Sequence, residues 1–200
     1  MPMPADTAHL LPPKRRPDGS PYRVAVVCLG NICRSPIGEA VLTAKLARAG
    51  LGDRVEVTSS GTGGWHVGEP MDRRAAAVLA AHGYDGSQHR ASQLEASSLQ
   101  RYDLVLAMDE SNHADIGDLV RDACHLQSCA DPDDAHDPRS PASASGRLRM
   151  FREFDPRATS GDRDVPDPYY GGDDGFTHVL ATVERTADAI VTALQRELGG

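Results

Sequence analysis

The sequence predicts an α/β fold, specifically a three-layer sandwich with a central, mainly parallel four-stranded sheet and helices on both faces. Short continuous apolar runs alternate along the chain with longer segments whose apolar residues recur at helical spacing, which is typical of a parallel sheet covered by helices. The chain has 200 residues, of which 40% are hydrophobic and only 4% aromatic. We therefore expect one domain with a largely aliphatic core.

The first strand is expected over 24–27, where Val-Ala-Val-Val forms a continuous apolar run. The helix that follows should have Ser35 as its N-cap and Pro36 at its first position. Gly50 stands where that helix should end, since glycine is the usual residue just beyond a helix C-terminus. A second strand is expected over 55–58.

The middle of the chain continues the alternation. A Gly-rich loop precedes a helix that carries residues 75–79 and ends at Gly83. A short polar helix over 95–100 comes before a third strand over 104–108, and Asp109 begins the next helix.

The last part of the chain contains a short buried segment over 151–154 and a final helix. The apolar stripe of that helix consists of Phe176, Leu180, Val183, Ala187, Ile190 and Leu194. Residues 1–21 are rich in proline and charge and should be a disordered tail. The single domain should then span 22–200, with a disordered insertion over 130–147, where hydrophobic residues are scarce.

Composition and charge exclude several classes of function. The formal net charge of −8 argues against a nucleic-acid partner. Four cysteines are too few for a disulfide-stapled secreted scaffold: Cys28, Cys33, Cys124 and Cys129. No segment reaches the length of a transmembrane helix, and prolines interrupt the N-terminal region where a signal peptide needs an apolar run. We therefore expect a cytoplasmic protein without a membrane partner.

The main chemical motif is a cysteine followed after five residues by Arg-Ser, namely Cys28, Arg34 and Ser35. It lies between a buried strand and a helix start, where a loop can turn its backbone N–H groups toward a tetrahedral anion. Arg34 offers a planar fork for two phosphate oxygens, and Gly30 should help the loop curl. The positive surroundings favour the thiolate form of Cys28, which is a nucleophile. The alternative is a buried structural cysteine with a surface arginine.

A proton donor for a leaving oxygen is expected in the segment DVPDPYY. Asp167 lies between two prolines that stiffen the loop and fix its direction. Tyr169 and Tyr170 follow it and could form flat walls for an aromatic ring. Considered without the cysteine motif, the same segment would be interpreted as a surface turn.

At this point the sequence resembles the low-molecular-weight protein tyrosine phosphatases. The resemblance covers roughly residues 23–198, with the insertion set aside, and depends mainly on VCLGNICRSPIGEA and DPYYGG. The segments SSGTGGWHVGEPMD, HRASQ and AMDESN occur between them in the family order. The family commonly has an arginine where this chain has Ser92, which leaves one outer contact in doubt.

By this resemblance, Cys28 is the nucleophile, Arg34 binds the phosphate, and Asp167 is the general acid and then the general base. The amides that surround the phosphate belong to Leu29, Gly30, Asn31, Ile32, Cys33 and Arg34. The residues that hold the loop in shape are Asn31, Ser35, Ser60 and His89, with Glu39 as the partner of His89. The residues that select aryl substrates at the entrance are Trp65, Tyr169 and Tyr170. Cys33 is a second cysteine that can pair reversibly with the nucleophile under oxidation.

The implied reaction is hydrolysis of an aryl phosphate monoester through a cysteinyl-phosphate. The substrate would be a phosphotyrosine-containing protein or a small aryl phosphate, and neither a cofactor nor a metal is required. Acidic residues over 131–137 show no spacing that defines a metal site.

Two alternatives remain from the residues alone. A thioredoxin-coupled arsenate reductase shares this fold and a similar loop, and it needs two further cysteines. Cys124 and Cys129 do not match that pattern well, and a reductase has no need of an acid such as Asp167. The second alternative is a phosphoanion-binding or redox-sensing module without turnover.

Overall fold

The computed structural model describes residues 7–16, 19–126 and 146–199. Its centre is a sheet of four parallel strands in the order β2-β1-β3-β4. The strands are β1 (Tyr22–Cys28), β2 (Val55–Gly61), β3 (Leu104–Ala107) and β4 (Leu148–Met150). Every strand pair in this part of the chain is parallel, where the sequence predicted a mainly parallel sheet.

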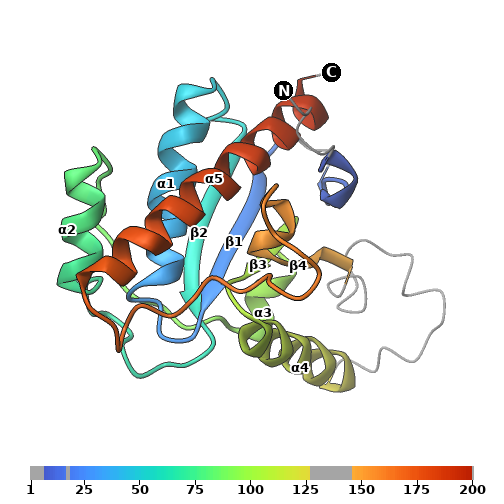
Figure 1. The fold of residues 1–200 in the computed structure, drawn as a ribbon. Helices are drawn as coiled ribbons and strands as arrows, with labels where there is room; N and C mark the ends of the chain where they lie inside the picture. Colours follow the sequence, from blue (N-terminus) through green and yellow to red (C-terminus); the bar gives the residue numbers. More distant parts are fainter. Residues whose placement is uncertain (1–6, 17–18, 127–145, 200) are drawn as a thin grey trace.

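Helices cover both faces of the sheet (Figure 1). On one side lie α1 (Arg34–Arg48), α2 (Arg73–Ala81) and α5 (Asp173–Leu198), and on the other lie α3 (Ala96–Leu99) and α4 (Glu110–Leu126). Short 3-10 helices in the described part of the chain include η1 (Ala8–Leu10) and η4 (Phe151–Phe154). The predicted three-layer sandwich is confirmed. Of the helices described, none has the length and apolar character needed to cross a bilayer.

The central strand β1 explains why its sequence is apolar without interruption. Val24 and Val26 belong to the core beneath α1 and α5, whereas Ala25 and Val27 belong to the core beneath α4. Successive side chains of a strand point to opposite faces, so a strand covered on both sides must be apolar at every position.

The end of α1 agrees with the sequence, but its beginning does not. Gly50 has a φ of 73° and follows the helix as predicted, with the Leu51 N–H donating to Leu46 O at 2.9 Å. The helix begins at Arg34, so Ser35 is its second residue and not its N-cap. The Ser35 hydroxyl bonds instead with residues of the loop between β1 and α1, which explains why it does not cap the helix.

Residues 7–16 pack against the domain, whereas the sequence predicted that they belong to a disordered tail. The Tyr22 hydroxyl donates to Pro12 O at 2.9 Å, and the Arg15 N–H donates to the Asp103 carboxylate at 2.6 Å. These hydrogen bonds attach a proline-rich segment to the start of β1 and to the turn before β3, a tertiary effect that composition does not report.

The predicted insertion over 130–147 lies outside the described residues except for its last two. Of these, Arg147 is buried and donates to Pro13 O at 3.0 Å. The predicted buried segment over 151–154 is confirmed, since Phe151 and Phe154 are both fully buried.

Candidate active site

The predicted site residues meet at the edge of the sheet where β1 ends. A cavity of about 320 Å³ opens there above the loop that connects β1 to α1. It is lined by Cys28, Leu29, Gly30, Ile32, Cys33, Arg34, Trp65, His66, Asp167, Tyr169 and Tyr170. Three segments far apart in the sequence thus contribute to one cavity, at the carboxyl ends of the strands where ligands of α/β folds bind.

Cys28 lies at the end of β1 and is only 3% exposed, yet it contributes to the lining of the cavity. Its Sγ lies 3.0 Å from Ser35 Oγ and accepts the Asn31 N–H at 3.3 Å. The Ser35 hydroxyl also accepts from the Asn31 side-chain amide at 2.9 Å. The sulfur therefore accepts a backbone N–H and lies within hydrogen-bond distance of a hydroxyl, an arrangement that suits a thiolate.

Asn31 determines the curvature of the loop. Its φ of 55° is in the left-handed region, which asparagine tolerates better than most residues. The sequence favoured Gly30 for this conformational freedom, but Gly30 does not have a positive φ. Gly30 instead allows a close approach, because a Cβ there would lie 3.2 Å from the ring of His66.

The Asn31 side chain and carbonyl are held by a network behind the loop. The side-chain amide donates to Ser59 Oγ at 2.9 Å, and its oxygen accepts the Ser92 N–H at 2.8 Å. His89 Nε2 lies 2.8 Å from Asn31 O, so this nitrogen carries the donated proton. Glu39 Oε2 accepts from Ser59 Oγ at 2.6 Å and lies 3.7 Å from His89 Nδ1.

The network uses the hydroxyl of Ser59 and not that of Ser60, which the resemblance had indicated. The Ser60 hydroxyl is buried and has no hydrogen-bond partner among the described residues, although its carbonyl accepts from Ser35 at 3.3 Å. Adjacent strand residues point to opposite faces, so a shift of one position along β2 decides which serine faces Asn31.

Arg34 is held by two carboxylates and a carbonyl. Its Nη2 lies 3.0 Å from Asp167 Oδ2, and its Nη1 donates to Asp109 Oδ2 and to Val165 O, the latter at 3.3 Å. The side chain is only 4% exposed. Burial alone would lower the pKa of Arg34, but Cys28, Asp109 and Asp167 outweigh it and raise that pKa, so the guanidinium stays charged.

Asp109 is a site residue that sequence reasoning missed. It also caps α4, because the Asn112 N–H donates to Asp109 Oδ1 at 2.7 Å. The available signal was its place just after β3, beside the end of β1, because the carboxyl ends of parallel strands share one edge. The segment AMDESN, which contains Asp109, resembles a family segment, but the sequence pattern assigned Asp109 only to the start of a helix.

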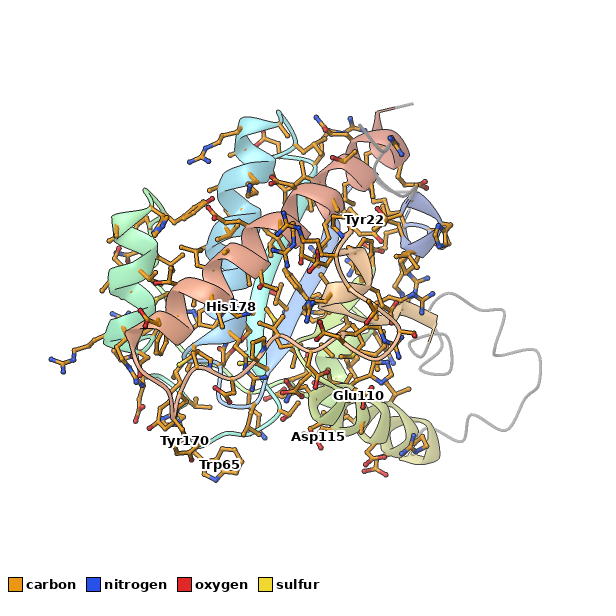
Figure 2. The ribbon with its side chains drawn as sticks, in the orientation of Figure 1. Tyr22, Trp65, Glu110, Asp115, Tyr170 and His178 are labelled. Atoms are coloured by element: carbon orange, nitrogen blue, oxygen red, sulfur yellow. The ribbon has the colours of Figure 1, made fainter. Side chains whose placement is uncertain are left out.

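Aromatic side chains form the rim of the cavity. Trp65 is 73% exposed, Tyr170 is 95% exposed, and the Tyr169 and Tyr170 rings meet edge to face at 5.1 Å. Figure 2 shows Trp65 and Tyr170 projecting at the same end of the molecule. Trp65 is thus a surface residue near the cavity and not part of the core.

Cys33 also lines the cavity, and its surroundings disfavour the thiolate form. Burial raises the pKa of the Cys33 thiol to about 12, and the Asp72 carboxylate and Cys28 add to the shift. Both cysteines are free thiols. Cys33 is therefore protonated at neutral pH, whereas a nucleophile must be a thiolate.

The remaining cysteines and the acidic run lie beyond the part of the chain whose side chains the structure describes. Cys129 and the acidic run over 131–137 lie outside the described residues, as does the side chain of Cys124. Elsewhere in the described chain, no three His, Cys, Asp or Glu side chains are grouped in a way that could hold a metal ion.

Comparison with known proteins identifies the family. The model of the low molecular weight phosphotyrosine protein phosphatase family matches residues 23–137 and 129–199. A low molecular weight protein-tyrosine-phosphatase of Streptomyces coelicolor is 45% identical over 182 residues, covering 90% of this chain and 97% of the relative. Low molecular weight protein-tyrosine phosphatase A of Mycobacterium tuberculosis is 43% identical over 164 residues, covering 82% and 86%.

Solved structures agree with the sequence comparison. YfkJ of Bacillus subtilis superposes with a TM-score of 0.71 at 29% identity, covering 90% of this chain and 98% of that one. A protein tyrosine phosphatase of Entamoeba histolytica, solved with Hepes in its active site, gives 0.73 at 27% identity and covers 88% and 97%. The chain therefore belongs to the low molecular weight phosphotyrosine protein phosphatase family, whose chemistry is that of a hydrolase with a cysteine nucleophile.

Proposed function

We propose that Cys28 is the nucleophile, Arg34 the phosphate clamp, and Asp167 the general acid and base in the hydrolysis of aryl phosphate monoesters. The observation that carries the proposal is their meeting in one cavity, with the Cys28 sulfur, a buried guanidinium and an exposed carboxylate all in its lining. These are the three functions that phosphoryl transfer through a covalent intermediate requires.

In the first step, the Cys28 thiolate attacks phosphorus and forms the S–P bond while the P–O bond to the aryl group breaks. Asp167 gives its proton to the departing phenolate oxygen. Its carboxylate lies 3.0 Å from Arg34 Nη2 in the free enzyme, so substrate phosphate must share or replace that contact. Binding of the dianion thus frees Asp167 to face the leaving group.

In the second step, water attacks the cysteinyl-phosphate and the S–P bond breaks. The Asp167 carboxylate, now without its proton, takes one from the water as it attacks. Inorganic phosphate leaves and the Cys28 thiolate is restored, with Ser35 Oγ placed 3.0 Å from the sulfur to stabilise it.

The phosphate in this scheme is held by Arg34 together with the backbone amides of residues 29–34. Two or more donors aimed at the equatorial oxygens supply the charge stabilisation, so the chemistry requires neither a metal nor a cofactor. The network from Asn31 through Ser59 to Glu39 keeps the loop in this shape, with His89 on the Asn31 carbonyl.

The substrate in this proposal is a phosphotyrosine-containing protein or a small aryl phosphate. The exposed rings of Trp65, Tyr169 and Tyr170 at the cavity support it, because flat apolar walls favour an aromatic ring over an alkyl chain.

Cys33 has a protective role in the same proposal. When a peroxide oxidises Cys28 to the sulfenic acid, Cys33 can lose its proton and attack the oxidised sulfur. The S–O bond breaks, the hydroxyl leaves as water with that proton, and the disulfide that forms can be reduced again by thiols. A cytoplasmic location fits this cycle, because a reducing compartment keeps both thiols free.

The test is hydrolysis of para-nitrophenyl phosphate and of phosphotyrosine by the purified protein. Cys28→Ser should abolish turnover, and Asp167→Asn should leave a residual rate about 10²–10⁴-fold lower. Asp188→Asn, an exposed substitution on α5, should behave as the parent. Undiminished hydrolysis by Cys28→Ser would refute the assignment, whereas arsenate-dependent oxidation of thioredoxin or phosphate binding without turnover would favour the alternatives.

A further inference from the structure

One arginine of α2 holds the loop that follows Asp167. The Arg74 guanidinium donates to Tyr169 O at 3.1 Å and to Gly171 O at 3.3 Å. The same group lies over the ring of Tyr169, at 5.7 Å from its centroid, and over that of Phe176 at 4.6 Å. Arg74 therefore contacts both the backbone and an aromatic ring of this loop.

The guanidinium is itself fixed by Asp72, the N-cap of α2. Arg74 Nε lies 3.1 Å from Asp72 Oδ1 and Arg74 Nη2 lies 3.0 Å from Asp72 Oδ2, which is a two-point contact between planar groups. Asp72 Oδ1 also accepts the Arg74 N–H at 2.8 Å. The hydrogen bond from the Arg74 side chain is the main reason that the pKa of Asp72 is lowered, so this carboxylate stays ionised.

The Asp72–Arg74 pair also contacts the catalytic loop. The Asp72 N–H donates to Ile32 O at 2.8 Å, and Ile32 lies in the loop between Cys28 and Arg34. The pair therefore connects the loop that holds the phosphate with the loop that holds the acid.

The connection reaches Asp167 through a single residue. The Tyr169 N–H donates to Asp167 Oδ1 at 3.0 Å, while the Tyr169 carbonyl accepts from Arg74. Fixing this carbonyl fixes the peptide plane between Tyr169 and Tyr170, and it limits the movement of Tyr169, whose N–H orients the carboxylate. The chain before Asp167 is held separately, by the Val165 N–H on Met108 O at 2.8 Å.

We propose that Arg74 is a positioning residue that aligns Asp167 with the leaving oxygen by holding Tyr169. The proposal rests on the proposed role of Asp167 as the general acid. Alignment of the acid matters most for a poor leaving group, so loss of Arg74 should slow phenyl phosphate more than para-nitrophenyl phosphate. A role in folding alone would slow both esters equally.

The experiment compares kcat/KM, which reports the step that releases the phenolate, for the two esters in Arg74→Ala, Arg74→Lys and Arg73→Ala. Arg73 is the matched control, because it is the adjacent, exposed arginine at the first position of the same helix. Arg74→Ala should lower kcat/KM for phenyl phosphate about 10- to 100-fold and kcat/KM for para-nitrophenyl phosphate only a few-fold. Arg74→Lys should fall between, since lysine keeps the charge over the rings but lacks the planar fork, and Arg73→Ala should match the parent.

The Asp167→Asn background separates the two levels of the proposal. If Arg74 acts through Asp167, the double variant should have the same ratio of phenyl phosphate to para-nitrophenyl phosphate rates as Asp167→Asn alone. A ratio unmoved by Arg74→Ala, or a further shift of the ratio in the double variant, would overturn the role of Arg74 alone. A ratio unmoved by Asp167→Asn would overturn the acid assignment and this proposal with it.

Discussion

The left-handed conformation of Asn31 can be tested separately from its hydrogen bonds. Asn31→Gly removes the side-chain bonds to Ser35, Ser59 and Ser92 but leaves a φ of 55° freely accessible. Asn31→Ala removes the same bonds and also places an L side chain in the left-handed region. The difference between their free energies of unfolding therefore measures the cost of the left-handed backbone conformation alone.

The sizes of three free-energy terms determine which of the two Asn31 variants is the more stable. Three lost hydrogen bonds cost about 1.5–4.5 kcal/mol in either variant, at about 0.5–1.5 kcal/mol each. Alanine adds about 1–2 kcal/mol of left-handed strain. Glycine adds about 0.4–1 kcal/mol through the greater freedom of the unfolded chain. The backbone strain in Asn31→Ala is larger than the entropic cost in Asn31→Gly. We therefore expect Asn31→Gly to be the more stable of the two variants by about 1 kcal/mol.

Gly50→Ala calibrates this difference within the same protein. Gly50 has a φ of 73°, and apart from its own chain neighbours no residue lies within 4 Å of the position that a Cβ would take. Only the backbone conformational energy therefore changes in Gly50→Ala. Urea unfolding followed by circular dichroism measures all three variants. Gly50→Ala should cost about 1 kcal/mol and keep the parental kcat, whereas both Asn31 variants should lose turnover. The reasoning fails if Asn31→Ala is as stable as Asn31→Gly while Gly50→Ala is destabilised.

Three further predictions concern charged and titratable groups. Asp109→Asn removes one of the carboxylates on the buried Arg34, so kcat/KM for para-nitrophenyl phosphate should fall about 10- to 100-fold and the free energy of unfolding by about 1–3 kcal/mol; unchanged kinetics would contradict this. The native state keeps the Cys33 proton between the ordinary pKa of 9.0 and about 12, so the free energy of unfolding should decline as pH rises above 9, and Cys33→Ala should reduce that decline in urea titrations. Burial would raise the pKa of Asp155, but hydrogen bonds from Arg185, the Arg157 N–H and Arg152 together outweigh burial and lower that pKa. This stabilisation is therefore present above about pH 4 and is lost as pH falls further. Arg185→Ala should therefore lower the free energy of unfolding at pH 7 by about 3 kcal/mol and weaken its dependence on acid, and an unchanged acid dependence would argue against the pair.

Features that depend on neighbours along the chain could be predicted from the sequence. The apolar run of β1 indicated a strand buried on both faces, and Gly50 and Gly83 marked the helix ends where φ is 73° and 78°. The spacing of Cys28 and Arg34 lies within one loop, so its chemistry could also be inferred locally.

Features that depend on contacts between distant segments could not be predicted from the sequence. The pairing of Arg34 with Asp109 joins the ends of two strands, and the use of Ser59 in place of Ser60 follows from which face of β2 meets the loop. Residues 7–16 have the composition of a disordered segment and are ordered by partners such as Asp103.

The sequence alone thus determined the order of the helices and of the first three strands, the cysteine-arginine motif and the candidate acid, because each depends on residue type and local spacing. It did not locate β4, which is only three residues long. The tertiary structure decided how Asp167 reaches the guanidinium of Arg34, and that Asn31 and not Gly30 adopts the left-handed turn. It also placed Arg74 between the two loops. The reason is that local periodicity specifies which backbone forms, whereas burial and hydrogen-bond satisfaction over the whole chain select which side chains finally meet.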